Sequence, residues 1–191
     1  MDFMRHKNLE GLHAPFSPSQ SSWFRYDDER AMEVYANRKS AELGTRLHRW
    51  AEETIKLKIK QPKSKKTIYS YVNDAIGFNM ETEVVLFYSE RFFGTTDAIS
   101  FRYEPKVGKN TLRIHDLKTG STPVKMEQLE IYAALFCLEY RINPSDIYME
   151  LRIYQNDEIL YHTPTEEDIF PIMEHIKHLD KLLESLEYKE G

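Results

Sequence analysis

Two carboxylates and a lysine lie at the ends of apolar, strand-like segments of the sequence. Asp116 and Lys118 end the run LRIHDLKTG, and Asp97 lies nineteen residues earlier in FFGTTDAISF. Residues two apart on a strand project from the same face, so Asp116 and Lys118 are aimed at one point. Carboxylates bind hard cations, and a lysine can position or activate water beside them. The pattern predicts metal-dependent phosphodiester hydrolysis, although each piece alone also occurs on ordinary strand faces and turns.

Two further pairs of polar residues have helical spacing. His48 and Glu52 are four residues apart and share one face of an expected helix. An imidazole beside carboxylates can ligate Mn²⁺ or Mg²⁺ and favours manganese, while the ordinary alternative is a surface His–Glu pair. Gln128 and Tyr132 have the same spacing after the lysine, where they can reach a phosphate or a base. Tyr132 is equally placed to be a core residue, because apolar residues surround it.

The composition is that of an ordinary globular protein. The chain has 191 residues, 41% of them hydrophobic and 30% charged, which suits one domain with one sizeable core. No apolar run approaches the roughly 20 residues that span a bilayer, and the first residues lack the order of a signal peptide. We therefore expect an intracellular, cytoplasmic protein with no membrane partner. The single cysteine, Cys137, excludes an internal disulfide and a four-cysteine metal site, and its apolar neighbours predict that it is buried.

Hydrophobic periodicity and chain-breaking residues predict the elements that position these side chains. Helices are expected over residues 17–37, 40–60, 124–140 and 165–186, a short helix or turn over 69–78, and strands over 82–89, 92–103, 111–117, 147–155 and 158–162. The first helix is expected to begin with a capping box formed by Ser17 and Gln20. Residues 1–16 have no periodicity and are expected to form an arm, followed by one domain over 17–191. The fold class is α/β, in the sense of α+β.

Positive charge is concentrated in one segment of an otherwise acidic chain. Residues 56–66 contain six lysines and no acid, whereas the whole chain has a net charge of −5. The overall charge argues against a protein that coats nucleic acid indiscriminately. The lysines fit a solvated helix end and loop, or a patch that contacts phosphates. The sequence leaves both interpretations open.

Taken together, the motifs resemble those of a known enzyme superfamily. Their order is Gly44-x-x-x-His48-x-x-x-Glu52, then Gly94-x-x-Asp97, then Asp116-x-Lys118-Thr119-Gly120, then Gln128-x-x-x-Tyr132. This order resembles the PD-(D/E)XK nucleases, and most of all the RecB-like exonuclease branch, which includes CRISPR-adaptation exonucleases and small phage-encoded proteins. The resemblance spans about residues 17–157. It implies a restriction-endonuclease-like core, with a central mixed sheet flanked by helices.

The resemblance also implies roles for individual residues. The groups that would hold Mg²⁺ or Mn²⁺ are His48, Asp97, Asp116 and the backbone carbonyl of Leu117. Lys118 would act on the water or the scissile phosphate. A further acid is expected before the Gly-x-x-Asp strand, with Glu83 as the first candidate and Glu81 as the second. Residues expected to contact the substrate or support the site are Gln128, Tyr132, Glu52 and Thr119, and those expected to follow the DNA backbone are Arg46, Arg49, Lys63, Lys65 and Lys66.

The activity that the resemblance implies is that of a metal-dependent DNA exonuclease. Its partner would be DNA with a free end or a single strand, in recombination, replication or repair, in the host cytoplasm if the protein is phage-encoded. Several members of this branch carry four cysteines for an iron–sulfur cluster, and with one cysteine none is expected here. The alternatives are a non-catalytic DNA-binding module on a nuclease fold, a structure-specific endonuclease and an RNase. Cleavage polarity, strand preference, the number of metals and the existence of a homo-oligomer stay open.

Overall fold

The computed structural model describes residues 6–9, 14–120 and 124–187. The chain divides into two compact units, Met1–Arg46 and Leu47–Gly191, and the division falls inside one long helix. The predicted division into an arm over 1–16 and a domain over 17–191 stays a prediction, and part of that arm lies outside the described residues.

The first unit contains short 3₁₀ helices and the start of α1 (Asp28–Lys56). The helices predicted over 17–37 and 40–60 are confirmed for residues 28–37 and 40–56, but they form one continuous helix, α1, and residues 18–25 form a 3₁₀ helix instead. The Ser17 hydroxyl bonds to Ser19 Oγ at 2.8 Å instead of capping a helix, and Gln20 is not helical. The Asp27 carboxylate accepts the Arg30 N–H at 2.8 Å and caps α1. Neither Gly nor Pro occurs in residues 37–40, so nothing there ends the helix.

The second unit is built on one five-stranded sheet. Its strands are β1 (Glu81–Ser89), β2 (Phe92–Glu104), β3 (Lys109–Leu117), β4 (Ile147–Gln155) and β5 (Glu158–His162). They are hydrogen-bonded in the order β1-β2-β3-β4-β5. Only β3 and β4 run parallel, and the other neighbouring pairs are antiparallel. The predicted strands, the α+β class and the mixed sheet are therefore confirmed.

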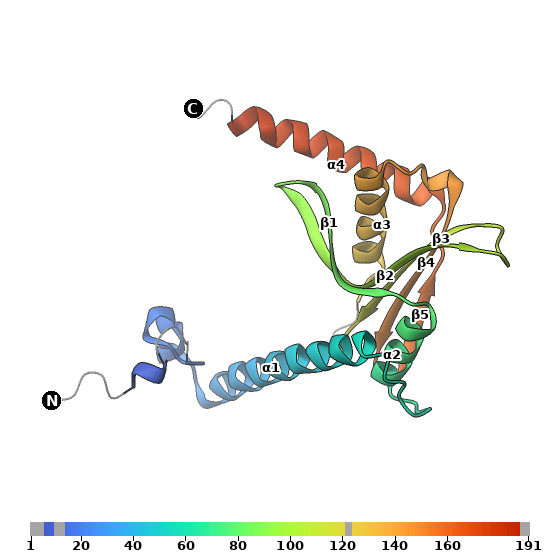
Figure 1. The fold of residues 1–191 in the computed structure, drawn as a ribbon. Helices are drawn as coiled ribbons and strands as arrows, with labels where there is room; N and C mark the ends of the chain where they lie inside the picture. Colours follow the sequence, from blue (N-terminus) through green and yellow to red (C-terminus); the bar gives the residue numbers. More distant parts are fainter. Residues whose placement is uncertain (1–5, 10–13, 121–123, 188–191) are drawn as a thin grey trace. The chain divides into compact units, whose positions relative to one another are not determined.

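Helices cover both faces of the sheet (Figure 1). A parallel pair needs a crossover connection, and α3 (Glu127–Tyr140) supplies it between β3 and β4. On that face, α3 and α4 (Glu166–Glu187) enclose a core that includes Leu112, Leu129 and Ile169, and Cys137 is buried there as predicted. On the other face, α2 (Thr67–Gly77) and the end of α1 pack against Leu117 and Tyr154. Segment 69–78, left between helix and turn by its sequence, is therefore largely helical.

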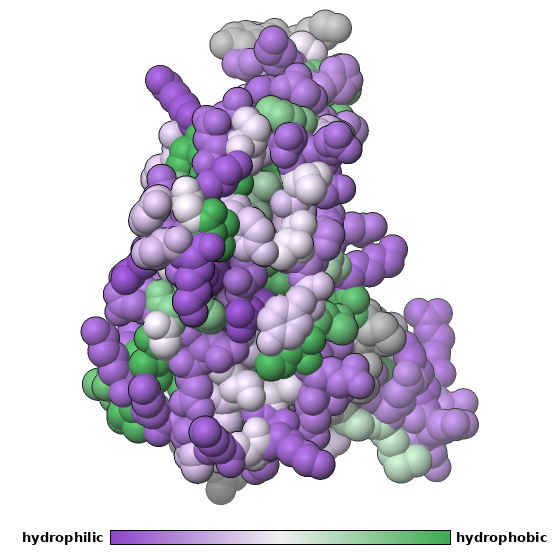
Figure 2. Space-filling view, turned by 90° about the vertical axis from the view of Figure 1, so that its right-hand side faces the viewer, coloured by the Kyte–Doolittle hydropathy of each residue, from purple (hydrophilic) through white to green (hydrophobic). Residues whose placement is uncertain are grey.

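The face drawn in Figure 2 is mainly hydrophilic. In Figure 2 hydrophilic side chains cover most of the face that is drawn, and hydrophobic ones occupy small separate areas between them. Among the helices of the described residues, none is long and apolar enough to cross a membrane.

Candidate functional site

Paired positions on β2 and β3 bring the two predicted acids together. Asp116 lies next to the end of β3 as expected, but Asp97 lies inside β2 and not at its end, because the strand continues to Glu104. The antiparallel register pairs Ala98 with His115, so the next position along places Asp97 across from Asp116. The Asp97 Oδ2 accepts a hydrogen bond from the backbone N–H of Leu117 at 2.8 Å. This bond ties the first acid to the strand that carries the second, and fixes the two carboxyl groups as neighbours.

Both carboxyl groups are buried enough to resist ionisation in the absence of a cation. Burial raises the pKa of Asp97 to about 6, and the neighbouring Asp116 carboxylate adds to the rise. Burial also raises the pKa of Asp116, while Lys118 opposes that effect. The Asp116 Oδ2 is buried without a hydrogen-bond partner in the described structure. Such a pair of oxygen ligands is suited to a divalent cation, whose charge would relieve the repulsion.

Lys118 links the second acid to α3. Its Nζ donates to Asp116 Oδ1 at 3.1 Å and to Gln128 Oε1 at 3.0 Å. Its backbone N–H donates to the carbonyl of Tyr154 at 2.9 Å, which holds the chain beyond β3 against β4. The structure therefore brings together an acid, a lysine and a glutamine from two sequence motifs. Thr119, the next residue, is exposed, and together with Lys118 it lines a pocket of 250 Å³.

Tyr132, one turn after Gln128, docks α3 onto β2. Its hydroxyl donates to the carbonyl of Thr95 at 2.7 Å. A Cβ at Gly94 would lie 2.9 Å from Tyr132 Cε1, so a larger residue at 94 would push the ring away. Tyr132 is half-buried and also packs against the core, which fits the core role considered from the sequence, while a contact with substrate stays a prediction. The Gly-x-x-Asp and Gln-x-x-x-Tyr motifs are thus in contact through Gly94 and Tyr132. This contact positions β2 just before Asp97.

His48 and Glu52, the pair with helical spacing on α1, make separate contacts. His48 Nδ1 lies 3.6 Å from Asp97 Oδ2, and its side chain is partly exposed. Glu52 forms an ion pair with Lys56 Nζ at 2.5 Å. His48 therefore lies beside the acids as the resemblance implies, while Glu52 supports the helix that presents it.

Glu83 lies on β1 across from Asp97. Its neighbours Thr82 and Val84 pair with Ala98 and Thr96, which places it opposite the acid. It is exposed, and its backbone has φ of 54°, a left-handed conformation that non-glycine residues rarely adopt. Its charge contributes to the raised pKa of Asp97. Glu83 is therefore placed near the acids, and strained backbone of this kind is found preferentially at functional sites.

The predicted basic residues are exposed. Arg46 and Arg49 lie on α1, and Lys63, Lys65 and Lys66 lie in the connection between α1 and α2. Of these, Lys66 lines the same pocket as Lys118. The structure thus brings one basic residue of the connection to the edge of the site.

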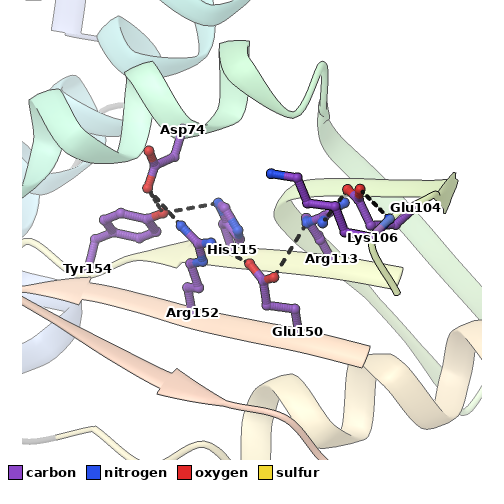
Figure 3. Close-up of polar contacts among 8 residues, drawn as sticks. All are labelled: Asp74, Glu104, Lys106, Arg113, His115, Glu150, Arg152 and Tyr154. Atoms are coloured by element: carbon purple, nitrogen blue, oxygen red, sulfur yellow. Dashed lines mark hydrogen bonds and ion pairs between the residues drawn. The ribbon is translucent and has the colours of Figure 1, made fainter. Parts of the chain in front are cut away.

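A polar network that the sequence did not reveal lies on the opposite face of the sheet (Figure 3). His115 precedes Asp116 on β3 and points to that other face, where Tyr154 Oη lies 3.2 Å from its Nδ1. Tyr154 also donates to Asp74 Oδ2 at 2.7 Å, and Arg152 donates to the same oxygen at 2.9 Å. Burial lowers the pKa of His115 well below its usual value, which keeps the ring neutral. The network ties α2 to β3 and β4 directly behind the acids.

Buried Tyr71 on α2 is another residue near the acids that sequence reasoning missed. Burial raises the pKa of its hydroxyl, and the charges of Asp97, Asp116 and Glu83 add to the effect. No motif or spacing in the sequence sets it apart from an ordinary core tyrosine. Only the folded arrangement shows that it lies close to the acids.

The side chains around Asp97 and Asp116 supply part of the ligand set that a hard divalent cation needs. In the described segments no three His, Cys, Asp or Glu side chains form a ready-made metal cluster. The unpartnered Asp116 Oδ2, the adjacent Asp97 carboxylate and the nearby His48 ring nevertheless form a donor set of the kind that Mg²⁺ or Mn²⁺ accepts.

Comparison of the chain with protein-family models, with curated proteins and with solved structures finds no match.

Proposed function

We propose that this chain is a metal-dependent deoxyribonuclease with a PD-(D/E)XK-type core that acts as an exonuclease in DNA recombination, replication or repair. One observation supports it above the others. Lys118 is held between Asp116 and Gln128, while Asp116 lies across the strand pair from Asp97. Two carboxylates that can hold a cation, with an ammonium beside them, are the groups that metal-dependent phosphodiester hydrolysis needs.

The buried carboxyl groups are suited to hold the cation. Asp97 and Asp116, with His48 and the carbonyl of Leu117, would bind Mg²⁺ or Mn²⁺. A bound cation supplies Lewis-acid polarisation of the phosphate, a lowered pKa of its water, and neutralisation of the leaving oxygen. The Leu117 N–H holds Asp97 Oδ2, so this carboxylate has one orientation before any substrate arrives.

Lys118 places a positive charge next to this donor set. An ammonium has three N–H donors, and Asp116 and Gln128 take two of them. The third can donate to the attacking water or to a phosphate oxygen as negative charge develops. Gln128 is exposed, and its amide nitrogen can donate to the substrate while its oxygen holds the lysine.

The test is a cleavage assay with end-labelled DNA. Single- and double-stranded DNA, linear and circular, are incubated with the protein in Mg²⁺, in Mn²⁺ or in EDTA. We expect metal-dependent loss of linear but not circular DNA, and the label position gives the polarity. Asp116→Asn should abolish the loss, whereas Asp146→Asn, at an exposed residue before β4, should not.

Three other outcomes would revise the proposal. Cleavage of circular DNA would make the protein an endonuclease. Binding of DNA without cleavage of any substrate would leave a DNA-binding module on a nuclease-like fold, and cleavage of RNA alone would identify an RNase.

A further inference from the structure

The basic connection between α1 and α2 is held in place. The Gln61 N–H donates to Asn73 Oδ1 at 2.8 Å, and Asn73 Nδ2 donates back to the Gln61 carbonyl at 3.0 Å. Asn73 lies on α2, so this pair of bonds fastens the connection to the helix. The lysines that follow Gln61 therefore extend from an anchored segment.

Most lysines of this region have no acidic partner. Lys56 pairs with Glu52, but the other five in residues 56–66 have no carboxylate within ion-pair distance in the described part of the chain. These five are Lys58, Lys60, Lys63, Lys65 and Lys66. Unpaired cations on an anchored segment attract a polyanion, because the positive field is not cancelled locally.

A pocket opens between this connection, α2 and β5. We call it the Tyr161 pocket; it has a volume of 370 Å³, and its lining includes Lys63, Tyr69, Ser70, Asp74, Arg152 and Tyr161. Figure 3 shows Asp74 directed from α2 toward Tyr154 and Arg152. Arg152 also pairs with Glu150, which in turn pairs with Arg113, so the Asp74 and Glu150 carboxylates each have a guanidinium partner.

Tyr161 presents an aromatic face to this pocket. One face of its ring lies on the Arg152 guanidinium, 4.8 Å from the ring centroid. The residue is 59% exposed. A ring held from behind by an arginine is a platform on which an unpaired base can stack.

The Tyr161 pocket and the pocket beside Lys118 share α2 as a wall. Lys66, Thr67 and Ile68 line the pocket beside Lys118, and the next residues, Tyr69 and Ser70, line the Tyr161 pocket. A strand with a phosphate at Lys118 would pass Lys66 on the way to the Tyr161 pocket.

We propose that the Tyr161 pocket binds one unpaired nucleotide of a single DNA strand, away from the bond that is cut. Tyr161 stacks on the base, and Lys63 contacts a phosphate of the same strand. That the bound strand is DNA rests on the proposed function. It makes the protein selective for single-stranded DNA, because a paired base cannot enter the pocket.

The test is DNA binding measured by fluorescence anisotropy in EDTA, where cleavage does not occur. Probes are a labelled oligothymidylate, a strand of equal length with abasic residues, and a duplex. Tyr161→Ala should weaken binding of the oligothymidylate by about tenfold and leave the abasic strand unaffected. Tyr161→Phe should bind as the wild type does, because the stacking face remains. Tyr103→Ala, at a tyrosine of β2 that is 63% exposed, is the matched control and should not change binding.

Lys63→Ala tests the phosphate contact. It should lower the slope of log affinity against log salt by about 0.7 for the single strand, whereas Lys106→Ala, in the turn between β2 and β3, should leave it unchanged. Equal affinity of Tyr161→Ala and wild type for the oligothymidylate would overturn the subsite, and so would tighter binding of the duplex. Because binding is measured without metal, a wild-type protein that cuts no DNA would contradict the nuclease alone. A cleaving protein with normal Tyr161→Ala binding would contradict the subsite alone.

Discussion

Tyr132 lies so close to the backbone of Gly94 that a Cβ at residue 94 would be 2.9 Å from its ring. The same tyrosine donates to the carbonyl of Thr95, so α3 is fastened to β2 two residues before Asp97. The contact that docks α3 onto β2 therefore also places Asp97.

Gly94→Ala should therefore displace α3 and lower both stability and cleavage. Overpacking of this kind costs about 1–3 kcal/mol in the free energy of unfolding, which urea denaturation measures. Adding Tyr132→Ala should relieve the clash, so the double variant should lose less than the sum of the single changes. Gly77→Ala is the control, because no atom would lie within 4 Å of its Cβ. Wild-type stability of Gly94→Ala would show that the ring moves freely.

Lys118→Ala should reduce metal-dependent cleavage by about a hundredfold or more and leave the fold intact. The physical reason is the loss of the ammonium that Asp116 and Gln128 hold beside the scissile phosphate. Initial rates on labelled DNA, with circular dichroism as a check on folding, measure the effect. Lys125→Ala removes a lysine whose side chain is 78% exposed and should cleave normally. Normal rates for Lys118→Ala would refute the role given to this residue.

Metal-free protein should lose stability as the pH rises through about 6. The pKa of Asp97 is about 6 in the folded chain and about 3.8 as a reference, so the folded state binds more protons between these values. The stabilising contribution of the protonated carboxyl is complete below pH 4 and is lost on ionisation.

Asp97→Asn should remove this pH dependence and keep the acceptor for the Leu117 N–H. In EDTA, the Tm of the variant relative to wild type should be a few degrees higher at pH 8 than at pH 5. An equal difference at the two pH values would argue against the buried, proton-binding carboxyl.

Mn²⁺ or Mg²⁺ should stabilise the wild-type protein at pH 8, which lies above the pKa of about 6 of Asp97, because a bound cation offsets the charge of the buried carboxylate. Saturation at a hundredfold excess over Kd adds about 2.7 kcal/mol, and EDTA should reverse the rise in Tm. Asp116→Asn should abolish the rise. His48→Ala should weaken the response to Mn²⁺ more than the response to Mg²⁺, because imidazole favours the softer ion. An equal rise in wild type and Asp116→Asn would place the metal elsewhere.

The sequence by itself determined the strands, the buried cysteine and the common face of Asp116 and Lys118. These features depend on alternation and local hydrophobicity, which act over a few residues along the chain. The residues at which helices begin were harder to predict from the sequence. The Ser17 pattern suggested a cap, but Asp27 caps the helix in the structure, because local capping signals compete and packing selects among them.

Only the tertiary structure decided which residues meet. The antiparallel register sets Asp97 across from Asp116, and a shift of one residue would send the facing side chain to the other side of the sheet. The crossover through α3 brings Gln128 to Lys118, and the parallel strand β4 brings Tyr154 to His115. These contacts join residues far apart in the chain, and their formation depends on how helices and strands bury their apolar faces together. Residue types and spacings along the chain carry no direct record of that packing.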